Sequence, residues 1–243
     1  MTKATVLALL VGVLVGLLVA GRSEAQDVGA GIDAYNRGDV SAAFALLKSV
    51  ADAGDSDAQV NLGYLYARGH GVKQDQQEAM RLYLLSARQG NAEGMNAVGF
   101  KYRYGTGVEI DLPRAVHWFC RAALSGDPRG LNNLAIMYYE GQGVVRDLGE
   151  ARALWRQAAE RGNPNAMFNL GRSLYREPPT DPDRGARLLI EAAEAGHAGA
   201  QQIVRQLGYR GSLPPAIDTG LDMRRALRDQ PPGKVRDCGF FAS

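Results

Sequence analysis

Apolar residues in the middle of the chain recur at helical spacing, in pairs of blocks. The first block places its apolar side chains at i, i+4, i+7 and i+8, which gathers them on one face of an α-helix. These residues are Ala58, Leu62, Leu65 and Tyr66. A second helical block follows a glycine-rich turn, with Ala79, Leu82, Tyr83 and Ala87 as its apolar residues. The pattern predicts two amphipathic helices joined by a short loop.

The same helix pair returns along the chain at a fixed period. Copies begin thirty-six residues apart at Gly94 and Gly130, and an altered fourth copy begins at Ala166. Aligned copies share an apolar column (Leu62, Val98, Leu134, Leu170), a glycine column (Gly69, Gly105, Gly141) and an aspartate column (Asp75, Asp111, Asp147). A period of this length is typical of a solenoid, in which stacked repeats bury a continuous core.

Start and stop signals agree with these helices. Asp75 is expected to cap the second helix of its repeat, with Glu78 completing a capping box. Gly69 is expected to end the first helix in a left-handed conformation. Gly63 lies inside that helix, where we expect a neighbouring helix to approach closely because no side chain intrudes. His197 follows Gly196 and takes an N-cap position.

The repeats resemble the Sel-1-like repeat family, a longer-period relative of the tetratricopeptide repeat. The residues that carry the resemblance are Ala58, Leu62, Gly63, Tyr66, Gly69, Gly71, Val72, Asp75 and Ala79, with Trp118 supplying the family's tryptophan in the next copy. The match covers about residues 33–201. The resemblance implies a right-handed superhelical solenoid of antiparallel helix pairs, with a concave face made by the first helix of each pair. It also implies a scaffold rather than an enzyme.

The two ends of the repeat region depart from the pattern. Residues 29–54 form a shortened opening unit, which makes about five repeats in all. In the last repeat, residues 177–180 replace the glycine loop with Glu-Pro-Pro-Thr, and we expect a stiffer loop there. Residues 218–229 are expected to form a capping helix and residues 230–243 a flexible tail. The expected domains are thus a solenoid over 26–209 and a cap with tail over 210–243.

Residues 1–25 differ from the rest of the chain. Lys3 precedes an apolar run over 6–20, and Ser23 and Ala25 are small residues placed for cleavage. This arrangement is typical of a signal peptide, although an uncleaved anchor remains an alternative. We expect a periplasmic or secreted protein without stable membrane insertion after cleavage. Its formal net charge would fall from +2 to +1, which argues against a nucleic-acid partner.

Motifs for chemistry are lacking. His70, His117 and His197 have no second ligand at metal-binding spacing, and no nucleophile or phosphate-binding motif is present, so we expect no enzyme activity, metal or cofactor. Cys120 and Cys238 are the only thiols. They could form a disulfide in an oxidising compartment, and Cys120 is expected to be partly exposed, but sequence alone does not decide the pairing.

The candidate binding site is the expected concave face. If the first helix of each repeat lines it, the inward side chains combine aromatic, apolar, Asn and Arg character, which suits an extended peptide. The candidates are Tyr64, Arg68, Asn96, Phe100, Arg103, Asn132, Tyr139, Phe168, Arg172 and Tyr175, with Val60 and Ile136 beside them. Some of these aromatics could instead pack between helices. Tyr66, Tyr102 and Tyr138 are assigned to such packing.

These expectations combine into one function with open alternatives. We expect an exported, non-enzymatic scaffold or adaptor that binds a protein or peptide partner on the concave face, in assembly or regulation of cell-envelope complexes. The envelope setting follows from the family resemblance, since a fold alone does not fix function. The alternatives are an envelope glycan-binding protein, which would use the same aromatic surface, or a hydrolase on the same scaffold. The partner and the oligomeric state stay open.

Overall fold

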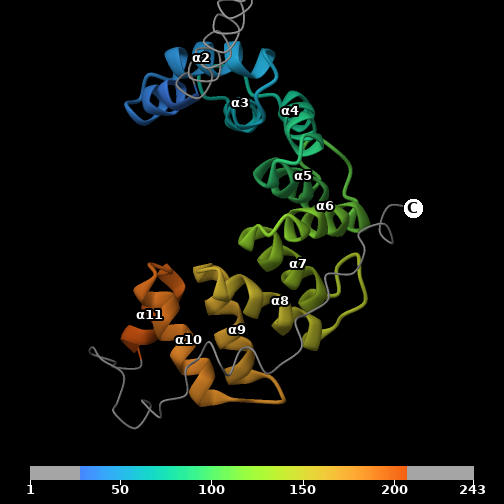
Figure 1. The fold of residues 1–243 in the computed structure, drawn as a ribbon, viewed down its shortest axis with the longest axis vertical. Coiled ribbons are helices and arrows are strands. Elements are labelled where there is room, and N and C mark those ends of the chain that lie inside the picture. The colour runs from blue at the N-terminus through green and yellow to red at the C-terminus, as the bar shows by residue number, and fades with distance from the viewer. Residues whose placement is uncertain (1–27, 207–243) are drawn as a thin grey trace, which may run out of the picture. The chain divides into compact units, whose positions relative to one another are not determined.

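The computed structural model describes residues 28–206, which contain helices and no strand. A first helix covers residues 28–36. It is followed by α2 (Val40–Asp52), α3 (Ser56–Arg68), α4 (Gln76–Arg88), α5 (Ala92–Tyr104), α6 (Leu112–Leu124), α7 (Pro128–Glu140), α8 (Leu148–Glu160), α9 (Pro164–Arg176), α10 (Pro182–Glu194) and α11 (Ala198–Gln206) (Figure 1). Consecutive helices pack as pairs. The predicted all-α repeat fold is confirmed.

Polar side chains cap the starts of the helices, including Asp75 as predicted. The side chains of Asp55, Asn91, Asp127 and Asn163 accept hydrogen bonds from backbone N–H groups at the starts of α3, α5, α7 and α9. Asp75, Asp111, Asp147 and Asp181 do the same for α4, α6, α8 and α10. These bonds satisfy donors that a helix leaves unpaired at its first turn. His197 also caps as predicted, because its Nδ1 accepts from the Ala200 N–H at 3.0 Å.

The expected capping box at Asp75 is wrong in its second half. The Asp75 backbone N–H donates to the Tyr66 carbonyl oxygen at 2.9 Å, so it has no need of the Glu78 side chain. The Glu78 carboxylate instead accepts from the Arg81 guanidinium at 2.6 and 2.7 Å. The loop between the two helices therefore supplies the acceptor that a capping box would have provided.

The glycine loop has a separate reason for each of its glycines. Gly69 ends α3 with a φ of 71°, the left-handed conformation predicted for it. A Cβ atom on Gly71 would lie 2.4 Å from the Val40 carbonyl oxygen. The second glycine is thus required because the loop lies against the backbone at the start of α2.

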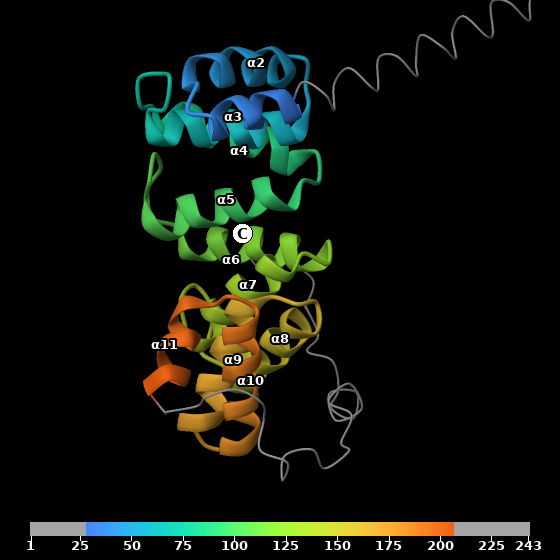
Figure 2. The same ribbon diagram turned by 90° about the vertical axis from the view of Figure 1, so that its left-hand side faces the viewer.

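Contacts divide the chain into two compact units. Unit 1 extends to Lys101 and includes Gly105–Glu109, while unit 2 holds Tyr102–Tyr104 and the residues from Ile110 onward. The core of unit 1 is built on α2 to α4 and includes Leu47, Leu62, Leu65 and Leu82. The core of unit 2 is built on α6 to α10 and includes Phe119, Leu134, Met137, Leu154 and Trp155. Within unit 2, α9 packs between α8 and α10 (Figures 1 and 2).

Close approach at the glycines inside the helices is confirmed. A Cβ atom on Gly63 would lie 2.7 Å from the ring of Tyr83, which packs on α3 from α4. In the last repeat two backbones meet directly. A Cβ atom on Gly171 of α9 would lie 2.9 Å from the Gly185 carbonyl oxygen of α10. A Cβ atom on Gly185 would lie 2.8 Å from the Gly171 carbonyl oxygen.

Several expectations lie outside the described residues. These are the signal segment over 1–25, the capping helix over 218–229 and the tail over 230–243. Within residues 28–206, no helix has both the length and the apolar character needed to cross a bilayer. Cys120 is only 1% exposed in the core of unit 2, so the expectation of partial exposure is wrong. Cys238 lies outside the described residues, and whether it pairs with Cys120 stays open.

Candidate functional site

The ten candidate residues all lie on the first helices of the repeats, namely α3, α5, α7 and α9, which we call the A helices. Tyr64, Arg68, Phe100, Arg172 and Tyr175 are exposed. Tyr139 and Phe168 are half-buried, and the Arg103 side chain is largely buried. Asn96 and Asn132 are each only 6% exposed. A partner can therefore reach most of the aromatic and arginine side chains but not the two asparagines.

Both asparagines bond within the protein. The Asn96 amide donates to the Ala92 carbonyl oxygen of its own helix at 2.9 Å. The Asn132 carbonyl oxygen accepts from the Asn169 amide at 3.0 Å, which links α7 to α9. Burial and these bonds give the two side chains a structural task, so we leave them out of the binding surface.

Arg103 is also engaged inside unit 2. Its Nη2 lies 2.5 Å from Glu140 Oε2, its Nε donates to Gln142 Oε1 at 3.0 Å, and its side chain is 10% exposed. These contacts tie the end of α5 to the end of α7 and the loop that follows it. A partner carboxylate would have to compete with Glu140 for this guanidinium.

In unit 1 the candidates join an aromatic cluster. The Tyr35 ring lies edge-on to Tyr64 at 6.0 Å and stacks with His70 at 5.7 Å. The Tyr35 hydroxyl and His70 Nδ1 are 2.8 Å apart, and the Arg68 guanidinium lies 5.7 Å from the centre of the Tyr64 ring. His70 is thus a packing partner of the candidate Tyr64.

In unit 2 the candidates surround a pocket of about 260 Å³. It lies where α7, α8 and α9 meet the loop after α9. Its lining residues are Ile136, Tyr139, Glu140, Trp155, Asn169, Arg172, Ser173, Arg176 and Glu177. The pocket therefore combines an aromatic wall with charged groups of both signs.

A network around Tyr139 forms one wall of this pocket. The Tyr139 hydroxyl donates to Glu177 Oε1, and this bond, with burial, raises the pKa of the tyrosine. Arg146 Nη2 lies 3.4 Å from Glu177 Oε2, and its guanidinium lies 5.7 Å from the centre of the Tyr139 ring. The ring of Trp155 packs on Tyr139 with 5.4 Å between centroids. The wall is therefore held from three sides.

Arg152 fixes the loop that carries Glu177, one of the lining residues of the pocket. This arginine on α8 is 7% exposed and donates to the carbonyl oxygens of Ser173, Glu177 and Pro179 at 2.7, 2.6 and 2.9 Å. It also donates to Ser173 Oγ at 2.8 Å. Burial lowers the pKa of the guanidinium. The oxygen acceptors replace the water molecules that this charged group loses when it is buried.

The charges of the pocket are unequal. Both of its carboxylates are engaged, Glu140 with Arg103 and Glu177 with Arg146 and Tyr139. Among residues 28–206, neither Arg172 nor Arg176 forms an ion pair. Arg172 lies over the ring of Phe168 at 5.4 Å, and both arginines are exposed. The pocket thus presents two positive charges to solvent.

The repeats can now be placed among known proteins. The Sel1 repeat matches residues 56–91, 92–127, 128–163 and 164–197. The chain belongs to the Sel1 repeat family. Its Sel1 repeats form a scaffold of the kind typical of protein-interaction adaptors, which is not a typical setting for catalysis. The resemblance inferred from the sequence is confirmed.

Several solved structures share the fold. A Sel1 repeat protein from Oxalobacter formigenes is 27% identical, with a TM-score of 0.70 and 84% of each chain covered. A protective antigen of uropathogenic Escherichia coli is 28% identical, with a TM-score of 0.63; 85% of this chain matches 46% of that one. An immunity protein from Pseudomonas aeruginosa is 21% identical, with a TM-score of 0.52, covering 82% and 71% of the two chains. Comparison with curated proteins finds no match.

Sequence reasoning missed Trp155, Arg152 and Glu177. Arg152 has a signal, because it stands in the repeat column that holds Met80 and Val116 in earlier Sel1 repeats. Glu177 has one too, since it stands where those repeats end their A helix with glycine. Trp155 has none, because an apolar residue is normal at its position, as Phe119 and Tyr83 show.

Proposed function

We propose that this protein is an exported, non-enzymatic adaptor that holds a segment of a partner protein on the A-helix side of unit 2. The observation that carries the proposal is the pocket lined by Arg172, where an aromatic wall lies beside two arginines that form no ion pair within residues 28–206. Phe168 and Tyr175 lie on the same helix as Arg172, whose guanidinium lies over the Phe168 ring, and Tyr175 is 49% exposed. Aromatic and arginine side chains are the residues that most often dominate binding energy at interfaces.

Two further points support this function. Sel1 repeats are typical of protein-interaction adaptors, and an extended repeat surface suits an extended segment of a partner. Export rests on the apolar segment over 6–20 and the small residues before Gln26. The description of the E. coli relative as a protective antigen fits a protein that meets the outside of the cell. An envelope complex is therefore the setting in which we place the partner.

Site-specific photo-crosslinking in the host cell tests the proposal. A photoreactive amino acid replaces Tyr175, and the same group at Val145, an 86% exposed loop residue of unit 2 that does not line the pocket, is the control. We expect a discrete crosslinked protein from position 175 that is absent at 145 and is lost when Arg172 is changed to Glu. No adduct at 175, or the same adducts at both positions, would contradict binding at this surface.

A further inference from the structure

The pocket between α7, α8 and α9 has the charge and shape of a site for a chain end. We infer that it binds the C-terminal carboxylate of the partner protein, with Arg172 and Arg176 as the cationic clamp and Tyr139 and Trp155 as the wall for the last side chain. This inference rests on the proposed function and adds to it the chemical group that is recognised.

The charged groups of the pocket indicate that its ligand is an anion. The carboxylates of Glu140 and Glu177 are held by Arg103, Arg146 and Tyr139, as ion pairs of 2.5 and 3.4 Å and a hydrogen bond. The guanidinium groups of Arg172 and Arg176 have no such pair among the described residues. A guanidinium prefers a carboxylate as a bidentate partner, so the missing charge in this pocket is an anion.

A buried N–H donor without an acceptor among residues 28–206 also points to a ligand in this pocket. Trp155 is 2% exposed, lines the pocket, and its indole N–H has no acceptor within residues 28–206. Buried indole N–H groups normally have a partner. A ligand that brings oxygen acceptors beside the ring would supply one after a small movement of the wall. A terminal carboxylate together with its preceding carbonyl brings three such oxygens.

The anchored wall at the end of α9 favours the terminal residue of a partner over an internal segment that would have to cross the pocket. Glu177 lines the pocket, and Arg152 holds the carbonyl oxygens of Glu177 and Pro179 at 2.6 and 2.9 Å. The anchored Glu177 bounds the pocket at the C-terminal end of α9. An internal Asp or Glu would need room for the backbone on both sides, whereas a terminal residue needs one entrance.

The test uses the tryptophan of the pocket as its reporter. The sequence has two tryptophans, Trp118 and Trp155, so a Trp118→Phe background leaves one indole signal in a ¹⁵N spectrum. The probes are N-acetyl-phenylalanine and N-acetyl-phenylalanine amide, which share their ring and differ in the terminal charge. We expect the acid to shift the Trp155 signal in a saturable manner and the amide to bind at least about tenfold more weakly.

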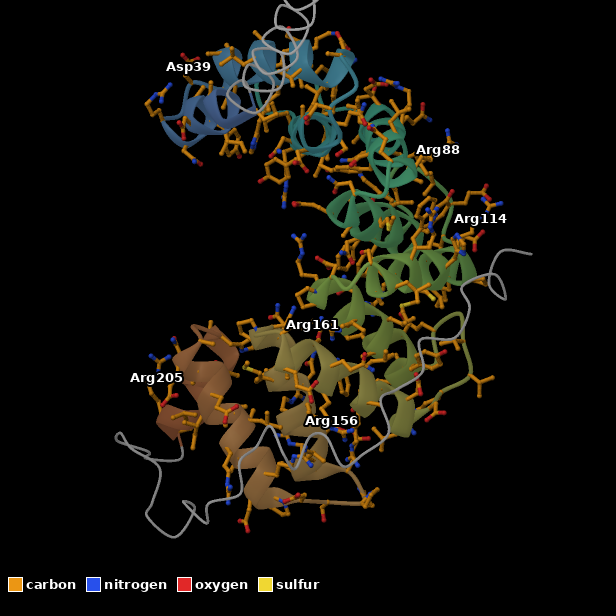
Figure 3. The ribbon with its side chains drawn as sticks, in the orientation of Figure 1. Asp39, Arg88, Arg114, Arg156, Arg161 and Arg205 are labelled. Carbon is orange, nitrogen blue, oxygen red and sulfur yellow. The ribbon has the colours of Figure 1, made fainter. Side chains whose placement is uncertain are left out.

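Variants separate the clamp from general charge. Arg172→Gln with Arg176→Gln should weaken the acid about tenfold and leave the weak amide binding unchanged, because both side chains are exposed and only their charge is lost. Arg161→Gln is the matched control. This exposed arginine lies at the C-cap of α8 (Figure 3) and is not among the residues that line the pocket. It should bind the acid as the Trp118→Phe background does. Circular dichroism checks that all variants stay folded.

Three outcomes overturn the inference. Equal binding of acid and amide, or no shift with either up to the solubility limit, shows that the pocket does not read a terminal charge. An N-acetylated, C-amidated peptide with an internal Asp that binds as well as the acid shows that no chain end is needed. In these cases a persisting Tyr175 crosslink leaves the proposed function standing. Acid binding without a crosslink would instead keep the pocket chemistry and remove the adaptor role.

Discussion

Arg152 illustrates how a single residue can turn a repeat into a site. Its column holds Met80 and Val116 in earlier repeats, both buried in the core. Burying a guanidinium in such a place is unfavourable unless its donors are satisfied. Here four donors reach Ser173 and the loop from Glu177 to Pro179, which has lost the glycine turn of the other repeats. The charge in the core and the altered loop therefore explain each other.

The contribution of His197 to the stability of α11 depends on pH. Its Nδ1 caps α11 by accepting from the Ala200 N–H, which requires that Nδ1 carry no proton. Burial lowers the pKa of His197, and the ring stacks on Phe168 at 4.1 Å. The folded state thus favours neutral imidazole. Its contribution to stability is present above the unfolded pKa of about 6.5 and is lost as pH falls through the lower folded pKa.

We therefore expect α11 to lose hydrogen-exchange protection as pH falls below about 6.5, after correction for intrinsic exchange. His197→Asn is the matched variant, because asparagine already caps α5 and α9 and does not titrate in this range. It should keep the cap and abolish the pH dependence. An equal dependence in the variant would assign the effect to another group.

At the scale of elements, α9 and α10 are joined by backbone contact. Gly171 and Gly185 face each other so closely that a Cβ atom on either would lie within 3.0 Å of the other's carbonyl oxygen. This contact brings α10 against the helix that carries Phe168, Arg172 and Tyr175. The geometry of the proposed surface thus depends on two residues that carry no side chain.

Gly171→Ala should lower the free energy of unfolding by about 1–3 kcal/mol, because overpacking at the Gly185 oxygen exceeds the gain in helix propensity of about 1 kcal/mol. Gly29→Ala is the matched control. It lies in the first helix with no atom within 4 Å of its added Cβ, so it should be neutral or slightly stabilising. Urea titration of both variants measures the difference. A neutral Gly171→Ala would mean that α9 and α10 can separate without cost.

The sequence predicts the elements of this protein well and the contacts between their side chains poorly. Caps such as Asp55 and stops such as Gly69 were predictable because each acts within a few residues of itself. The pairing of the helices was predictable from the repeat period, because residues in the same column of the aligned repeats must occupy equivalent places in the fold. The contact of Arg103 with Glu140 was not predictable, since a side chain's direction decides whether it meets a neighbouring repeat or solvent. The pocket was not predictable either, because it depends on Glu177 and Arg152, which break the repeat.

At the scale of the whole molecule, the repeats form two compact units, each with its own core. In a repeat protein each element contacts mainly its neighbours in sequence, so stability is close to a sum of local terms. Leu47 is 2% exposed in the core of unit 1, and Leu188 is 3% exposed in the core of unit 2. Truncating either leaves a cavity whose effect should stay within its own unit.

Leu47→Ala should reduce hydrogen-exchange protection in α2 and α3 by the equivalent of about 2–5 kcal/mol and leave α8 to α10 nearly unchanged. Leu188→Ala should produce the reverse pattern, so each variant serves as the control of the other. Hydrogen-exchange mass spectrometry resolves the two units in one experiment. Uniform loss of protection along residues 28–206 in both variants would instead show a single cooperative unit. In a single cooperative unit, a partner bound to unit 2 alone would stabilise α2 and α3 as strongly as α9. If the two units unfold separately, as we expect, the same partner would leave the stability of α2 and α3 unchanged.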